Sequence, residues 1–455
     1  MGGLPRRRQA TAGGRARAEG LGGRWAWHPQ ARVFVIITVV RRLLLLLLLV
    51  ALSLRLGWAL SRPVGLDAAL GDQFEYLSLG RNLLEHGQLK FFDGRFGEDV
   101  YAYRTPGYPV FVAMCGGNVT VVRVAQALVD TSTVLAIYLL ARRFFGARAG
   151  LAAGVIVALN PFLIYFTGLI LTETLFTAML AWGMYFMVGR RPLVGLSVLA
   201  LSVLVRPSAV GLVPLVAALG AMAAPIPGVT CWERVSVGVV NAAMGVLAVV
   251  IALFPWAVRN SRHPSLQSWI WTTTNGGITL YDGFHDGATG ASDQSTFVQA
   301  VIAGRHPAKG PLRGEVARDG EFRQWARNWI EEHPGRSLQL ALVKIGRTWS
   351  PVPLSSEYGS RLYVVTGLCY TLPLYALVFI GLWRGGGGKT LKALCLLPAI
   401  YFTAVHALSV GSLRYRVPCE PPMAVIAGAV LVRCRSARPG ELTASEPGAV
   451  RGMPH

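Results

Sequence analysis

Apolar stretches long enough to cross a lipid bilayer recur along most of this chain of 455 residues, and they limit its fold more than any other feature. The first includes RRLLLLLLLVALSLRLGWAL, from Arg41 to Leu60. A membrane-spanning helix needs about 20 mainly apolar residues, within a range of about 17–25. Hydrophobic residues make up 53% of the sequence and charged residues only 15%, a composition that argues against a soluble protein of several domains. The sequence therefore predicts an all-α integral membrane protein.

Short basic turns separate the apolar stretches and indicate their orientation. Lys and Arg are enriched in short cytoplasmic loops, and the turns ARRFFGARAG (141–150) and GRRP (189–192) fit that rule. Alternation of sides then predicts about ten spans with both termini cytoplasmic. The expected spans are 33–60, 119–141, 150–167, 169–188, 193–205, 208–224, 236–256, 362–383, 393–410 and 417–433.

Two long polar segments fall on the outer face in this topology, where interfacial helices are also expected. Residues 1–32 are Gly- and Arg-rich, which is typical of a disordered cytoplasmic tail or of an upstream start. The expected organisation is a cytoplasmic tail 1–32, an N-terminal transmembrane catalytic module 33–256 with its first outer loop 61–117, a large outer loop region 257–360, C-terminal transmembrane helices 361–433 and a cytoplasmic tail 434–455.

The net charge of +21 has a simple explanation in these basic turns. No groove-reading motif accompanies the charge, so no nucleic-acid partner is expected. The six cysteines include no CxxC pair and indicate neither a metal site nor a disulfide framework. Walker A, G-x-S-x-G and HExxH motifs are also absent from the sequence, which removes the usual signatures of ATP-driven transport and zinc proteolysis.

The first outer loop contains GDQFEYLSLGRNLLEHG (71–87), with Asp72 and Glu75 one helical turn apart. D-x-x-E is a capping-box pattern, so the two carboxylates have a structural interpretation as helix caps. Apolar Phe74 and Leu77 among polar positions favour a helix that lies in the membrane interface. A carboxylate at the start of such a helix can also face a cavity, and the two interpretations are compatible.

The same loop ends in YAYRTPGYPVF (101–111), in which Pro106, Gly107 and Pro109 predict a rigid turn directly after Arg104. The tyrosines of this segment are typical of an interfacial anchor. The functional alternative makes Arg104 a clamp for a phosphate group, because a guanidinium binds phosphate oxygens in pairs.

Charges within or beside spans are expensive and are functional candidates. Glu173, in GLILTETLF (168–176), lies near the outer end of a span. Arg123 or Arg206 could pair with it, but a role facing a cavity is favoured. Asp130 lies inside a span and serves either such a role or a hydrogen bond to another helix.

The segment HALSVGSLRYRVPCEPP (406–422) places Arg414 and Arg416 on either side of Tyr415 at the outer end of a span. Positive charge is not expected on that side. The arginines either bind ordinary lipid phosphates or hold the headgroup of an anionic substrate. Glu420 could pair with either arginine.

These segments follow one another in a recognisable order. D-x-x-x-Y at Asp72–Tyr76 precedes R-x-P-G-Y-P at Arg104–Pro109, Q-x-L-x-D, L-T-E and R-P, and then FPWAVRN, NGGITLYDG, EEHPGRSLQLALVKIGRTW and HALSVGSLRYRVP. The ordered set resembles the bacterial family 39-like glycosyltransferases of the GT-C fold, relatives of the protein O-mannosyltransferases and of the lipid A aminoarabinose transferase. The resemblance covers roughly residues 33–433.

The resemblance implies a multi-span bacterial enzyme of the inner (plasma) membrane. Such an enzyme transfers a sugar from a polyprenyl-phosphate-linked donor to a lipid, glycan or protein acceptor on the outer face, amid membrane lipids. It implies that Asp72 is the catalytic base and that Arg104 contacts the donor phosphate. It places Arg206 and the cluster of Arg414, Tyr415 and Arg416 near the donor headgroup. The remaining substrate-binding candidates are Tyr76 and Glu173.

One departure from the family pattern concerns metal binding. Relatives often have an acidic pair in the first loop, whereas Gln73 follows Asp72 here. We therefore expect neither a metal nor another cofactor. A transporter or flippase of polyprenyl-linked sugars is the alternative function, and a scaffold for envelope assembly is a third. The transporter or flippase would need the anion-binding arginines, and the scaffold would need only the membrane fold. Neither would need a base at Asp72.

Overall fold

A computed structural model describes residues 29–63, 66, 71–225, 227–295, 298, 314–354, 360–384 and 387–432, with side chains from residue 37 onward. Nearly all of the predicted tail 1–32 and all of the tail 434–455 lie outside the described residues. The chain divides into two units at Arg42, and the contacts given below belong to the unit that begins at Leu43. The domain organisation expected from the sequence stays a prediction.

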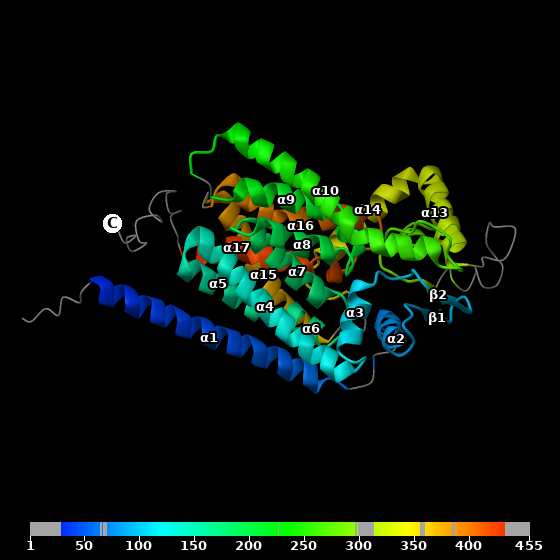
Figure 1. The fold of residues 1–455 in the computed structure, drawn as a ribbon, viewed down its shortest axis with the longest axis horizontal. Helices are drawn as coiled ribbons and strands as arrows, with labels where there is room; N and C mark the ends of the chain where they lie inside the picture. The colour runs from blue at the N-terminus through cyan, green and yellow to red at the C-terminus, as the bar shows by residue number, and fades with distance from the viewer. Residues whose placement is uncertain are drawn as a thin grey trace, which may run out of the picture. The chain divides into compact units, whose positions relative to one another are not determined.

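Helices dominate the described residues (Figure 1). The helices with one predicted span each are α1 (Pro29–Ser61), α4 (Val119–Phe145), α7 (Glu173–Met187), α8 (Pro192–Ser202), α9 (Leu212–Ala223), α10 (Cys231–Arg262), α15 (Arg361–Trp383), α16 (Lys389–Ala407) and α17 (Glu420–Leu431), while α5 (Ala147–Ala158) and α6 (Pro161–Thr167) share one. The other elements are α2 (Gly71–His86), β1 (Phe91–Asp93), β2 (Glu98–Val100), α3 (Gly107–Met114), η1 (Pro207–Ala209), α11 (Gly276–Gly283), α13 (Glu315–Glu332), α14 (Pro334–Thr348), η3 (Leu413–Tyr415) and η4 (Val417–Cys419).

Every predicted span thus coincides with a helical segment, but the helices differ in length. Among the described residues, α1, α4, α10, α15 and α16 are each long and apolar enough to cross a membrane. The bent pair α5–α6 passes the same test together, and α8 and α9 are shorter apolar helices. The protein is a multi-pass membrane protein, and the number of about ten spans stays a prediction.

The bend of 55° between α5 and α6 has a local cause. Pro161 cannot donate a hydrogen bond to continue α5, and the Asn160 side chain accepts from the backbone N–H groups of Phe162 and Leu163 instead. Asn160 also donates to Glu420 of α17 over 2.7 Å. The break therefore satisfies polar groups that would otherwise be unpaired inside the bundle.

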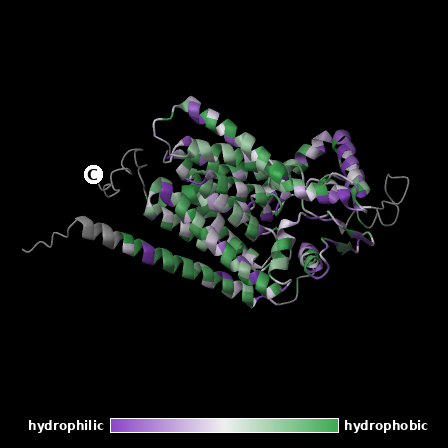
Figure 2. Ribbon diagram, viewed as in Figure 1, coloured by the Kyte–Doolittle hydropathy of each residue, from purple (hydrophilic) through white to green (hydrophobic). Residues whose placement is uncertain are grey.

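The core of the bundle forms where α17 packs against α4, α5, α15 and α16. Small residues allow this close approach: a Cβ added at Gly428 of α17 would lie 2.6 Å from the backbone N of Ala153 in α5. Close contact between small residues is a common means of helix association in membranes. Figure 2 shows that apolar residues cover the bundle, whereas polar residues are concentrated on α2, α13 and their connections.

The polar elements gather at one end of the bundle (Figures 1 and 2). Strands β1 and β2 pair as an antiparallel hairpin with Phe91 opposite Val100. The outer loop region packs onto the chain just after this hairpin, because Thr274 N–H donates to Ala102 O over 3.0 Å. Glu315 at the start of α13 accepts hydrogen bonds from Thr274 Oγ1 and from the backbone N–H of Ala102. The two predicted outer loops thus form one joint structure.

Asp130 makes an ion pair inside the bundle. Its Oδ2 accepts a hydrogen bond of 2.5 Å from Arg55 Nε of α1, and both side chains are buried. Arg55 also donates to the carbonyl oxygens of Val157 and Ala158. Of the two roles considered for Asp130, the structure supports the contact between helices.

Replacing one partner of this pair is expected to be more harmful than replacing both. Asp130→Leu leaves the Arg55 charge buried without a counter-charge, which typically costs about 3–5 kcal/mol. The double variant Arg55→Leu/Asp130→Leu should regain much of that loss. Thermal unfolding of the single and double variants in detergent measures the coupling. Additive losses would show that the two side chains act independently.

Candidate active site

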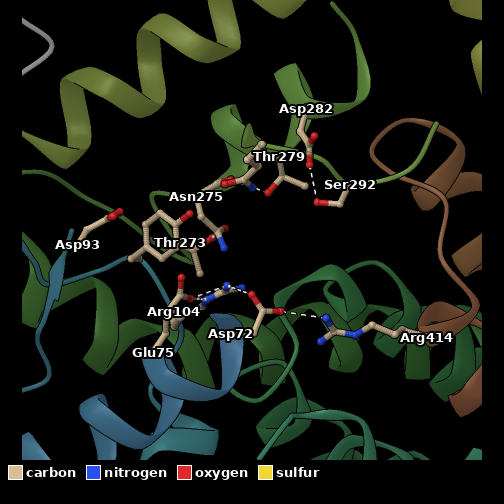
Figure 3. A network of polar contacts seen from close by, with 12 residues as sticks. Asp72, Glu75, Asp93, Arg104, Thr273, Asn275, Thr279, Asp282, Ser292 and Arg414 are labelled. Atoms are coloured by element: carbon tan, nitrogen blue, oxygen red, sulfur yellow. Dashed lines mark hydrogen bonds and ion pairs between the residues drawn. The ribbon is translucent and has the colours of Figure 1, made fainter. Parts of the chain in front are cut away.

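Asp72 connects two arginines that are far apart in the sequence. Helix α2 begins at Gly71, one residue earlier, so Asp72 lies in its first turn. Its Oδ1 accepts from Arg104 Nη2 over 2.7 Å, and its Oδ2 accepts from Arg414 Nη1 over 2.9 Å (Figure 3). The side chain remains 31% exposed. Both carboxylate oxygens therefore bind guanidinium groups, not the helix start as the capping-box interpretation required.

Arg104 is held by a second carboxylate on the same helix. Its Nε donates to Glu75 Oε2 over 2.7 Å, and its guanidinium carbon lies 5.3 Å from the ring centroids of both Tyr76 and Tyr103. Glu75 therefore binds Arg104 rather than the start of α2. Two carboxylates and two aromatic rings fix the direction in which this guanidinium points.

Glu173 extends the ion-pair chain beyond Arg414. It is fully buried at the first position of α7, and its Oε1 accepts from Arg414 Nε over 2.8 Å. Arg206 Nη2 lies 3.7 Å from the same oxygen. Of the two partners considered from the sequence, Arg206 is the one that the structure brings to Glu173. Arg123 donates instead to the carbonyl oxygen of Pro63.

The R-x-P-G-Y-P turn brings the Arg104 and Arg206 segments together. Gly107 N–H donates to Leu204 O over 2.8 Å. A Cβ added at Gly107 would lie 2.7 Å from the Leu204 backbone, so only glycine permits this contact. The approach places the start of α3 against the chain just before Arg206.

Arg416 belongs to a different network, although it lies two residues from Arg414. Its side chain is fully buried and donates to Glu420 Oε1 over 2.9 Å, to Thr371 Oγ1 over 3.1 Å and to the carbonyl oxygen of Ser350. The structure therefore does not bring Arg416 to the substrate-binding candidates. Glu420 pairs with Arg416, as one of the two alternatives predicted.

The charges around Asp72 alter the acidity of the carboxylates on α2. Burial alone would raise the pKa of Asp72, but Arg104 and Arg414 outweigh burial and hold that pKa well below its usual value. The pKa of Glu75 is raised, because burial and the charge of Asp72 outweigh the opposing effect of Arg104 and Arg95. The two neighbouring carboxylates thus differ in proton affinity, with Asp72 the stronger acid.

The β1–β2 hairpin contributes residues that sequence reasoning missed. Arg95 binds both carboxylate oxygens of Asp93, at 2.9 and 2.8 Å, and its Nη2 lies 3.7 Å from Glu75 Oε1. It also donates to Tyr103 Oη over 2.9 Å. The available signal was the run DGRFG (93–97), whose glycines are typical of a hairpin turn around Arg95. The chain of ion pairs thus continues from Glu75 to the tip of the first outer loop.

No group of three or more His, Cys, Asp or Glu side chains suited to a metal ion occurs among the described residues. The carboxylates near Asp72 are each engaged by arginine. The expectation that no metal or other cofactor is used is not tested by this arrangement.

Residues 109–256 match the model of the dolichyl-phosphate-mannose-protein mannosyltransferase family. Among solved structures, the oligosaccharyltransferase of Archaeoglobus fulgidus tethered with an acceptor peptide is similar, with a TM-score of 0.51 and 13% identity over 87% of this chain and 49% of that chain. The same enzyme, AglB, in complex with an inhibitory peptide and a dolichol-phosphate, gives a TM-score of 0.51 and 13% identity over 87% and 50%.

ArnT from Cupriavidus metallidurans bound to undecaprenyl phosphate is also matched, with a TM-score of 0.33 and 15% identity over 89% of this chain and 79% of that chain. None of the curated proteins matches the sequence. The chain spans about half the length of the archaeal oligosaccharyltransferase structures that it matches, 49% and 50%. At this identity the likeness shows the fold, and the GT-C fold predicted from the sequence is confirmed.

Because the pKa of Asp72 is low, the difference in stability between the wild type and Asp72→Asn should depend on pH. Because the folded pKa lies below the unfolded value of about 3.8–3.9, the ion pairs of Asp72 stabilise the protein fully above that value. The stabilisation is lost as pH falls further toward the folded pKa. The melting temperature of the wild type should exceed that of Asp72→Asn by the same amount at pH 7 and pH 5, and by less at pH 3.

The Arg104→Gln background provides the control for this measurement, because one of the two cations that lower the pKa of Asp72 is then absent. The effect of Asp72→Asn should be smaller in that background. A difference that is independent of pH down to pH 3 would contradict the assignment.

Proposed function

We propose that the protein is a membrane glycosyltransferase that moves a sugar from a polyprenyl-phosphate-linked donor to a hydroxyl of a lipid, glycan or protein acceptor. The observation that carries the proposal is the half-buried Asp72 carboxylate between the guanidinium groups of Arg104 and Arg414, at the polar end of a GT-C bundle. This arrangement combines a base with cations suited to an anionic leaving group.

A donor phosphate would compete with Asp72 for the same guanidinium groups. Arginine binds phosphate and carboxylate oxygens with similar geometry. When a phosphate engages Arg104 and Arg414, the forces that lower the pKa of Asp72 are partly cancelled. Donor binding would thus release the carboxylate and make it a better base only when the sugar is in place.

The transfer step follows from these positions. The acceptor oxygen forms a bond to the anomeric carbon of the sugar while the bond from that carbon to the phosphate oxygen breaks. Asp72 takes the proton of the acceptor hydroxyl, and the electron pair of the broken bond stays on the polyprenyl phosphate. Attack from the face opposite the phosphate inverts the anomeric centre. The guanidinium groups stabilise the charge that develops on the leaving phosphate.

The outer loop region offers polar groups to the acceptor. Thr273 and Asn275 lie across from Arg104 and Asp72 in Figure 3, and Thr273 Oγ1 donates to Asn275 Oδ1 over 2.7 Å. The hydrogen bond from Thr274 N–H to Ala102 O anchors this segment beside Arg104. We assign acceptor recognition to this part of the chain.

Two helices support placement of the site on the outer face of a bacterial inner (plasma) membrane. Helix α7 begins at Glu173 in the site and ends just before Arg190 and Arg191, while α4 ends with Arg142 and Arg143. Basic residues therefore follow the ends that point away from the site, and the positive-inside rule assigns those ends to the cytoplasm. On this basis we propose a periplasmic site and cytoplasmic termini.

Labelling of intact cells tests the orientation. A membrane-impermeant thiol reagent should label Glu85→Cys, at the exposed end of α2, but should label Arg190→Cys only after the cells are broken open. The wild-type protein measures labelling of the native cysteines. The reverse pattern would place the site on the cytoplasmic face.

We further propose that transfer uses no metal or other cofactor, because the arginines can neutralise the leaving phosphate themselves. Full activity in the presence of EDTA is the expected result. Loss of activity that a divalent cation restores would contradict this part of the proposal.

Asp72→Asn is the decisive variant for the chemical step. Asparagine preserves the size of the side chain and is compatible with a helix start, but it cannot take the proton. Sugar transfer should fall by a factor of about 10²–10⁴, the usual contribution of a general base. The matched control is Asp99→Asn, which removes a carboxylate from a surface ion pair with Lys90 in the same outer loop. The control should retain wild-type activity.

Purified protein in detergent is the system for this assay, because it also tests the alternative function. A flippase or transporter of polyprenyl-linked sugars has no second leaflet in a micelle and would produce no glycosylated acceptor. Retention of full transfer by folded Asp72→Asn would show that Asp72 is not the base.

A further inference from the structure

Three buried side chains around Tyr415 each carry a polar atom without a hydrogen-bond partner among the described residues. The atoms are Glu173 Oε2, Arg206 Nη1 and His406 Nε2. The three residues are at most 8% exposed. Buried polar groups are nearly always paired, so three such atoms in one place call for an explanation. Two potential donors and one acceptor complement a phosphate group that carries a hydroxyl-rich substituent.

Tyr415 connects these side chains to the Asp72 site. The His406 ring stacks on the Tyr415 ring with centroids 3.4 Å apart and planes within 4°. The guanidinium carbon of Arg206 lies 5.4 Å from the same ring centroid. The neighbouring residue, Arg414, binds both Asp72 and Glu173. The unpartnered atoms therefore border the place where the donor phosphate is proposed to bind.

His406 is held in one orientation at the end of α16. Its Nδ1 lies 3.1 Å from Ser409 Oγ, and its ring also stacks on Phe402 with a centroid distance of 5.9 Å. Nε2 is consequently the ring atom left for a ligand. Neither the sequence analysis nor the proposed function assigns a role to this histidine.

The ion pairs that run from Glu75 to Arg206, beside His406, carry no net charge together. Arg104, Arg206 and Arg414 contribute three positive charges. Three carboxylates in contact with them, those of Asp72, Glu75 and Glu173, contribute three negative charges. A phosphodiester adds one negative charge to this set. Histidine is the side chain whose charge changes most readily near neutral pH, so His406 can restore the balance by taking a proton.

We propose that His406 is a donor-binding residue that takes up one proton when the phosphodiester of the lipid donor binds and then donates from Nε2 to a phosphate oxygen. The proposal rests on the proposed function, which supplies the phosphate. Arg206 Nη1 donates to the same group, and Glu173 Oε2 accepts from a hydroxyl of the attached sugar. As the donor bond breaks, the phosphate gains a second negative charge beside an imidazolium, which stabilises it.

The test measures proton uptake on binding of polyprenyl methyl phosphate, a phosphodiester without a transferable sugar. Its single negative charge does not change between pH 6 and pH 8.5, so any proton taken up must go to the protein. Isothermal titration of the protein in detergent at pH 7.5, in buffers that differ in ionisation enthalpy, counts the protons. We expect about one proton per bound lipid, with a Kd that rises up to about tenfold per pH unit above neutrality. Polyprenol, which lacks the phosphate, should cause no uptake.

His406→Gln is the matched variant, because its amide reaches the position of Nε2 and can donate but cannot become charged. It should bind the lipid with no proton uptake and with a Kd that is independent of pH. His333→Gln, at an exposed position, should behave as the wild type.

The possible results distinguish this inference from the proposed function. Failure of the wild-type protein to bind the phosphodiester better than polyprenol would overturn the donor assignment itself. Phosphate-dependent binding without proton uptake by the wild type, or uptake that persists in folded His406→Gln, would overturn only the role of His406. Absence of uptake by the wild type would overturn this role even if the variant does not fold.

Discussion

The pairing of carboxylates with guanidinium groups at the polar end of the bundle is the interaction on which the site depends. Asp72 and Arg414 are 342 positions apart in the sequence, yet their side chains are joined by a hydrogen bond of 2.9 Å. Arg104 joins Asp72 to Glu75, and Arg414 joins Asp72 to Glu173. An unpaired charge at such a position would be strongly unfavourable, so each ion pair requires the helices that carry its partners to come together.

The same physics produces two kinds of ion pair in this protein. Arg55 with Asp130 and Arg416 with Glu420 are fully enclosed. The first pair joins α1 to α4, and the second is a local pair at the start of α17 whose arginine also binds Thr371 of α15. Asp72 with Arg104 is partly open to solvent, and both partners retain some exposure. A ligand can compete for the open pairs of Asp72 more readily than for the enclosed pairs Arg55–Asp130 and Arg416–Glu420. This difference explains why Arg414 belongs to the proposed donor site and why Arg416, two positions away, has a structural role.

The proposed chemistry uses the open pairs as a substrate-dependent switch. The cations that would bind a phosphate pair with Asp72 and make it a weak base. A bound phosphate would satisfy the same cations and return basicity to Asp72, while His406 would compensate for the added charge. The base and the donor site would then act in sequence because they share the same arginines.

The apolar stretches alone determined that this chain forms a bundle of membrane helices, because an unpaired backbone is unfavourable in lipid. The order of the short motifs identified Asp72, Arg104, Glu173 and Arg414 as candidates before any contact was known. The tertiary structure decided which charges meet: it assigned Glu75 to Arg104, separated Arg416 from the site and placed His406 beside Tyr415. Sequence patterns report local periodicity, whereas an ion pair between distant segments depends on how the helices pack in three dimensions.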